Sequence, residues 1–125
     1  MAAPNILNLS SIVGVTTMVN IANAEASNVI ISNSSSSNSA YRINSIIASN
    51  IDGTNAAWVS VKITNNAAGA GTSFPIADTI TVPADSTLVV LGKDAPIYLE
   101  EDRSIIAIAQ NADDICVIAS YEVIS

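Results

Sequence analysis

The chain has 125 residues, with 4 Lys and Arg against 11 Asp and Glu, so its formal net charge is -7, and it contains no His and a single Cys. A length of this order accommodates one domain, and the negative charge argues against nucleic acid or an anionic membrane as a partner. Without His the chain lacks the side chain that most often performs acid–base catalysis and binds metals, and the lone Cys116 excludes an intrachain disulfide or a multi-thiolate metal site.

The apolar residues are mainly of the kind that favours strands. The chain contains 19 Ile and 11 Val but only 5 Leu, and branching at Cβ suits a pleated strand better than a helix. Charged residues make up 12%, about half the usual share for a soluble domain. We therefore expect part of the surface to be covered by another molecule. The alternative is a monomer whose surface is rich in Ser, Thr and Asn.

Residues 1–10 are predicted to form an N-terminal arm, followed by a single domain over residues 11–125. Pro4 prevents regular strand pairing, and Ile6, Leu7 and Leu9 give the segment an apolar side that could lie on a neighbouring subunit. A frayed chain end is the alternative interpretation.

Short runs rich in Ile, Val and Thr alternate with turn clusters throughout the remaining chain, which predicts an all-β protein. The rhythm is typical of an antiparallel β-sandwich, jelly-roll-like, with about eight strands. A turn or two of helix within residues 16–26 is a minor alternative. The expected strands are Ile12–Val19, Ser27–Ser32, Tyr41–Ser49, Ala57–Thr64, Thr79–Val82, Thr87–Leu91, Ile97–Leu99, Ser104–Ala109 and Ile115–Ile124.

Trp58 is a candidate interface residue. In the run Ala57–Thr64, alternation places Val59, Val61 and Ile63 inside, so the only Trp of the chain falls on the outer face. A single large outward aromatic suits a contact with a partner, whereas a Trp at a strand end could equally lie under a loop.

The last two expected strands carry apolar residues on both faces, and a strand that is apolar on both faces is covered on both. The second cover could be another copy, another protein, or loops of the same chain. The candidate interface residues on these strands are Ile106, Ile108, Ile118 and Tyr121.

Acidic residues gather in the predicted turns after residue 77, and no arrangement of them predicts catalysis. If the turn Glu100–Asp102 met Asp113 and Asp114, their oxygens could bind Ca²⁺, although solvated turn carboxylates are the simpler interpretation. No serine has a His to activate it, and Cys116 lies in an apolar strand, where a thiol behaves as a small hydrophobe. We expect no enzyme activity, no metal and no cofactor.

Residues 81–125 resemble the end of small virion structural proteins of tailed bacteriophages, including those of cyanobacterial hosts. The similar features are a strand that ends in Val82–Pro83, the run Thr87–Leu91, the segment Pro96–Glu100, an acidic turn, an Ile/Ala strand and the closing Ser120–Ser125. The opening Asn5–Leu9 is also similar. The acidic turn of such proteins usually carries a Gly, whereas this chain has Glu101-Asp102-Arg103.

The resemblance implies a β-sandwich subunit present in many copies on the virion. It would be a capsid decoration or cement protein that contacts itself, for example as a trimer, and other virion proteins such as the major capsid protein. A protein of the neck or tail is one alternative, and a glycan-binding module of a fibre is another. A glycan-binding module would require an exposed aromatic beside a loop concavity.

Overall fold

The computed structural model describes residues 7–125, which form nine strands and no helix. The strands are β1 (Ile12–Asn20), β2 (Asn28–Asn33), β3 (Ala40–Asn50), β4 (Ala57–Thr64), β5 (Ser73–Val82), β6 (Thr87–Leu91), β7 (Ile97–Leu99), β8 (Arg103–Ala109) and β9 (Ile115–Ile124). The predicted all-β class is confirmed. The helical alternative for residues 16–26 is wrong, because β1 continues to Asn20 and turns follow it.

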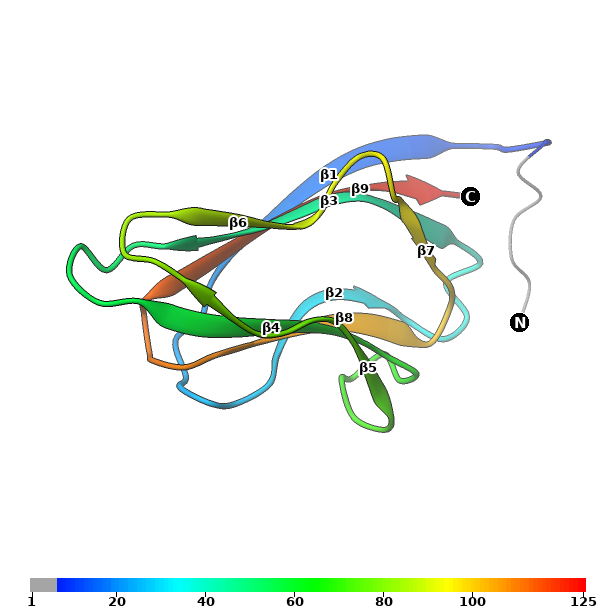
Figure 1. The fold of residues 1–125 in the computed structure, drawn as a ribbon. Helices are drawn as coiled ribbons and strands as arrows, with labels where there is room; N and C mark the ends of the chain where they lie inside the picture. Colours follow the sequence, from blue (N-terminus) through cyan, green and yellow to red (C-terminus); the bar gives the residue numbers. More distant parts are fainter. Residues whose placement is uncertain (1–6) are drawn as a thin grey trace.

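The strands form two antiparallel sheets that face each other as a sandwich (Figure 1). One sheet has the order β1-β9-β3-β6, with β7 also paired to β3, and the other has the order β2-β8-β4-β5. β6 and β7 pair with successive parts of β3, so they act as two halves of one interrupted edge strand. Counted in this way, each sheet has four strands, and the order is that of a jelly roll. The predicted β-sandwich is therefore confirmed.

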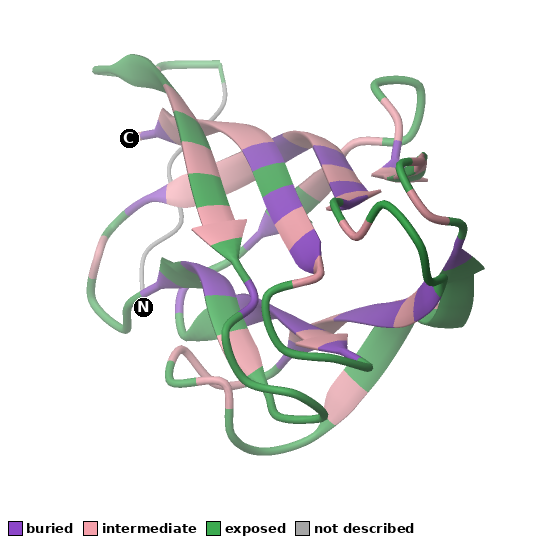
Figure 2. Ribbon diagram, turned by 90° about the vertical axis from the view of Figure 1, so that its left-hand side faces the viewer, coloured by how far each residue is buried: buried purple, intermediate pink, exposed green. Residues whose placement is uncertain are grey.

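The core lies between the two inner faces. It is built mainly from fully buried Ile and Val side chains, of which Ile43 and Ile46 come from β3, Val59 and Val61 from β4, and Ile105 from β8. Burying one such side chain stabilises the fold by about 1.5–3 kcal/mol. Stripes of buried residues along the strands mark this layer in Figure 2.

The largest change from the expected strand boundaries is in β5. β5 was expected only from Thr79, but it begins at Ser73 and contains Pro75. Because β5 lies at the edge of its sheet, a residue without an N–H is tolerated there. The predicted arm, residues 1–10, lies mostly outside the described residues. At its end, the Ser10 N–H donates to the Ser125 carbonyl at 2.8 Å.

The loop between β4 and β5, residues 65–72, covers part of the outer face of the four-stranded sheet. A Cβ on Gly69 would lie 2.9 Å from Val29 Cγ2 and 3.2 Å from Ile106 Cγ2, so the loop main chain sits directly on these two side chains. Gly69 also has a φ of 85°. Both the close approach and the left-handed conformation therefore require glycine at this position.

Gly69→Ala should lower the free energy of unfolding by about 1–2 kcal/mol, since the new methyl group displaces the loop and the backbone becomes strained. Urea denaturation would measure the loss. Gly53→Ala is the matched control, because a Cβ there meets nothing closer than 3.7 Å. Equal stabilities of the two variants would show that the loop does not pack on Ile106 as described.

Candidate interaction surface

The five predicted interface residues do not form one surface. Trp58, Ile106 and Ile108 point to the outer face of the four-stranded sheet, and Ile118 points to the outer face of the five-stranded sheet. Tyr121 points inward. The alternation of strand side chains was read correctly for the first four, but the sequence could not show that two different sheets carry them.

Tyr121 packs against the core on the inner face, which argues against its predicted role as an interface residue. Its ring stacks on that of Tyr41 with centroids 5.4 Å apart, and Thr17 donates a hydrogen bond to its hydroxyl. The pairing with Ile43, which is fully buried, places Tyr121 on the inner face. Apolar residues on both faces of β9 made an inward residue look like a contact residue.

Tyr41 should make the stability of the fold depend on alkaline pH. Burial raises the pKa of the Tyr41 hydroxyl above its usual value of 10.0, and the nearby Tyr121 adds to this increase. A raised pKa in the folded state stabilises the fold below the unfolded pKa, and that contribution is lost as the pH rises above about 10. Stability of the wild-type chain should therefore fall above pH 10 more steeply than that of Tyr41→Phe. Parallel curves in urea denaturation at several pH values would contradict this.

Ile106 is also wrong as an interface residue. It is only 3% exposed, because the 65–72 loop lies over it, so it has no surface left for a partner. Here a loop of the same chain provides the cover. Trp58 and Ile108 are half-buried, and the Trp58 N–H donates to the Gln110 side chain at 3.1 Å. Their contact with a partner stays a prediction.

Ile118 belongs to a continuous apolar row that crosses the five-stranded sheet on its outer face. Met18 lies opposite Ile118, Ile118 lies opposite Ile47, and Ile47 lies opposite Val89. Met18 is 76% exposed, Val89 62% and Ile118 36%, while Ile47 is half-buried. We call Met18, Ile118, Ile47 and Val89 the apolar row. Directly opposed side chains on one face lie about 5 Å apart, so the row is one contiguous stripe.

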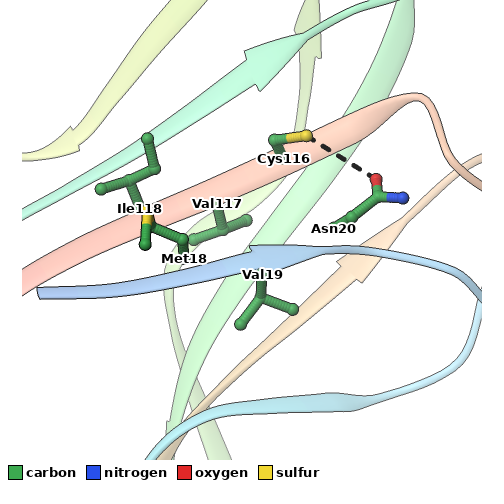
Figure 3. A pocket seen from close by; sticks show the side chains of 6 residues that line it. All are labelled: Met18, Val19, Asn20, Cys116, Val117 and Ile118. Carbon is green, nitrogen blue, oxygen red and sulfur yellow. Dashed lines mark hydrogen bonds between the residues drawn. The ribbon is translucent and has the colours of Figure 1, made fainter.

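A polar row borders the apolar row on one side. The Cys116 thiol donates to the side-chain amide oxygen of Asn20 at 3.7 Å, and the hydroxyls of Ser49 and Thr87 lie 3.0 Å apart. Figure 3 shows Asn20, Cys116 and Ile118 on one side of β1 and β9, with Val19 on the opposite side. An open hollow of about 300 Å³ lies here; it is lined by Met18, Val19, Asn20, Cys116, Val117 and Ile118. Cys116 is therefore partly exposed at this face rather than packed as a core hydrophobe.

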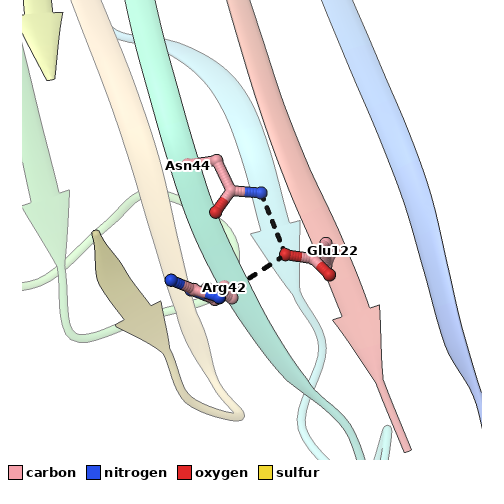
Figure 4. A network of polar contacts seen from close by, with 3 residues as sticks. All are labelled: Arg42, Asn44 and Glu122. Atoms are coloured by element: carbon pink, nitrogen blue, oxygen red, sulfur yellow. Dashed lines mark hydrogen bonds and ion pairs between the residues drawn. The ribbon is translucent and has the colours of Figure 1, made fainter. Parts of the chain in front are cut away.

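An ion pair lies on the other side of the apolar row, further along β3 and β9. Glu122 of β9 accepts a hydrogen bond from Asn44 at 3.0 Å and lies 3.9 Å from an Arg42 guanidinium nitrogen (Figure 4). Arg42 and Glu122 are the only charged residues in the five strands of this sheet. The sheet is thus neutral in a chain whose net charge is -7.

The acidic turns do not converge. Glu100–Asp102 precedes β8 and Asp113–Asp114 follows it, so the two turns lie at opposite ends of a strand of seven residues. At about 3.3 Å per residue they are more than 20 Å apart, and the Ca²⁺ site considered from the sequence is wrong. No group of three His, Cys, Asp or Glu side chains within residues 7–125 is placed to hold a metal ion. Asp102 has a φ of 58°, so it takes the left-handed position that a Gly would occupy in this turn.

Comparison with known proteins does not assign the chain to a family. No protein-family model matches the chain, and no curated protein matches it in sequence. One solved structure, of Bacillus endospore appendages described as a family of disulfide-linked pili, is similar to it with 18% identity and a TM-score of 0.48, covering 90% of this chain and 87% of that one. Nothing about function is transferred at this level of similarity. The part of the chain that the structure describes has no helix suited to cross a membrane.

Proposed function

We propose that the chain is a structural subunit of a tailed-phage virion and contacts neighbouring virion proteins through the apolar row. The observation that carries the proposal is a contiguous apolar stripe on a neutral sheet face of a strongly acidic chain. Charge is depleted at the centre of protein interfaces, and apolar side chains are enriched there. The resemblance of residues 81–125 to virion proteins supports the phage assignment.

Within the virion, we assign the chain to the head as a decoration or cement protein that binds the major capsid protein. Its action is mechanical: apolar sheet faces buried between subunits hold the shell together against internal pressure. At about 25 cal/mol per Å², a contact of ordinary size supplies enough apolar burial without a covalent link. A place on the neck or tail would use the same surface.

A jelly roll suits this mechanical role, because the role requires a rigid body with a binding face and no catalytic residues. Two packed sheets form a rigid body, and one outer face can bind a partner while the loops stay free of it. The glycan-binding alternative is less well supported, since all six residues that line the hollow on this face are non-aromatic. A sugar site would need an aromatic ring on which the sugar can stack.

Add-back to stripped particles tests the proposal. Virions of the phage that encodes the chain would be analysed by mass spectrometry, depleted of the chain with mild denaturant, and heated with and without added purified chain. We expect the chain in many copies per particle, co-sedimentation of added chain, and DNA release at a higher temperature after add-back. Absence of the chain from purified virions would overturn the phage assignment. Binding to the tail only would move it from the head.

A further inference from the structure

The outer edge of β1 has no partner strand among residues 7–125, so its outward main-chain groups form a regular set that no described strand uses. Ser11 and Ser125 exchange two main-chain hydrogen bonds of 2.9 Å, and the Ile21 N–H donates to the Ile115 carbonyl. Because such pairs alternate along an antiparallel ladder, odd-numbered residues of β1 bond to β9 and even-numbered ones point away. No strand within residues 7–125 pairs with that outward side. The outward residues are Ile12, Gly14, Thr16, Met18 and Asn20.

The other three sheet edges carry features that oppose pairing. β2 is short and bulged between Val29 and Ile31, β5 contains Pro75 and register shifts opposite β4, and the edge formed by β6 and β7 is interrupted at residues 92–96. These are the devices by which proteins protect exposed edges. β1 has none of them: it pairs with β9 over nine residues without a shift and contains neither Pro nor a charged side chain.

We propose that β1 pairs antiparallel with β1 of a second copy, around a two-fold axis at Val15, so that the five-stranded sheets of two chains become one continuous sheet. In this register Ile12 lies opposite Met18 of the second copy, and Gly14 lies opposite Thr16. Ile12 is 55% and Met18 76% exposed, and both point to the outer face. The pairing therefore places Ile12 of each copy against Met18 of the other, and these two contacts cover all four side chains. A register centred on Thr16 would place Met18 opposite Gly14 and leave Ile12 beside Asn20.

Charge and shape favour a second copy as the occupant. Two chains of net charge -7 repel each other through their acidic turns, but β1 is uncharged and the only charges in its sheet are paired. A Cβ on Gly14 would meet nothing within 4 Å, so no side chain crowds the outer face beside this edge. The edge is about 30 Å long and offers about eight new main-chain hydrogen bonds. The buried area is on the order of 1,000 Å², which is at the low end for a specific interface, so we expect a weak and reversible dimer.

The proposal does not depend on the proposed function, because the pairing is a property of the chain in solution. Sedimentation of the whole chain from about 1 µM to about 1 mM should show a reversible monomer–dimer equilibrium. Thr16→Pro removes an outward N–H to which β9 does not bond. It also places the proline ring where β1 of the second copy would pair. We expect dimerisation to weaken by about 100-fold with an unchanged circular dichroism spectrum. Thr16→Val, which keeps the N–H, is the matched control and should dimerise as the wild type does.

Disulfide trapping tests the register without relying on the proline variant. In a Cys116→Ser background, Val15→Cys places two thiols at a non-hydrogen-bonded pair, where Cα atoms lie about 4.5 Å apart and a disulfide can form. Val13→Cys is the control, since Val13 would face Thr17 and lie about 13 Å from its own counterpart. Oxidation should cross-link the first variant and not the second.

A wild-type chain that stays monomeric up to about 1 mM would overturn the proposal. A dimer that survives Thr16→Pro, or one that Val13→Cys traps as efficiently as Val15→Cys, would also overturn it. A dimer that is lost on deletion of residues 1–6 and is not trapped by Val15→Cys would assign the edge to that terminal segment instead.

Discussion

Val89→Glu should weaken binding of the chain to depleted virions by at least about 100-fold while leaving the fold intact. Val89 is 62% exposed at one end of the apolar row, so folding does not require it to be buried. Binding would place the new carboxylate in an apolar contact with no positive partner in its own sheet other than Arg42, which already pairs with Glu122. Burial of an unpaired charge costs several kcal/mol, and about 2.7 kcal/mol already corresponds to 100-fold.

Phe74→Glu is the matched control for that variant. Phe74 is 60% exposed, and the substitution adds the same charge, but it lies on β5 of the opposite sheet. It should bind like the wild-type chain. Co-sedimentation over a range of chain concentrations would measure both affinities. Equal losses for the two variants would indicate a general charge effect, and wild-type binding by Val89→Glu would remove the apolar row as the contact surface.

Asn33→Ala should lower the free energy of unfolding by about 2–4 kcal/mol, a large share of the stability of a domain of this size. Asn33 is fully buried at the end of β2, and its side-chain amide donates to the Ser39 carbonyl at 2.9 Å and to the Leu99 carbonyl at 3.0 Å. The side-chain oxygen of Asn33 accepts a hydrogen bond from the Ser37 hydroxyl. Truncation removes the donor that Asn33 supplies to both backbone carbonyls and leaves a cavity.

Urea denaturation with linear extrapolation would measure this loss. Asn33→Asp keeps the size but cannot donate, so it should be at least as destabilising. Asn55→Ala is the control, since Asn55 is exposed and its side-chain amide donates only a long bond of 3.5 Å to the Asp52 carboxylate; we expect a change within about 0.5 kcal/mol. A loss below that value for Asn33→Ala would mean that the amide does not hold the β2 end, the 34–39 loop and β7 together.

Local sequence patterns were enough to place most of the strands. The runs Ala57–Thr64, Thr87–Leu91, Ile97–Leu99 and Ile115–Ile124 match β4, β6, β7 and β9 at both ends, because β-branched residues and turn residues alternate there without ambiguity. The first part of β5 was missed because Pro75 normally argues against a strand. Whether a proline-containing segment lies at a sheet edge depends on strand order, which alternation along one strand does not reveal.

The candidate site depends on information that a single strand does not carry. Ile118 was identified, but Met18, Ile47 and Val89 were not, since they come from three other strands and meet only through the register of β1, β9, β3 and β6. Two errors have a related cause. A loop distant in sequence covers Ile106. Tyr121 lies on the inner face of β9, a strand with apolar residues on both faces, so the sequence did not show which face is buried. The sequence offered one local signal for this surface: the run Ile12–Asn20 contains the large apolar Met18 and no charged residue.

A reconstruction of the virion at side-chain resolution tests the central claim most directly, because it shows both whether the chain is present and which of its faces is covered. We expect many copies of the jelly roll in the particle, with the outer face of the five-stranded sheet against a neighbouring protein and with Met18, Ile118, Ile47 and Val89 out of contact with solvent. A particle in which the chain is present but this face is open to water would contradict the account.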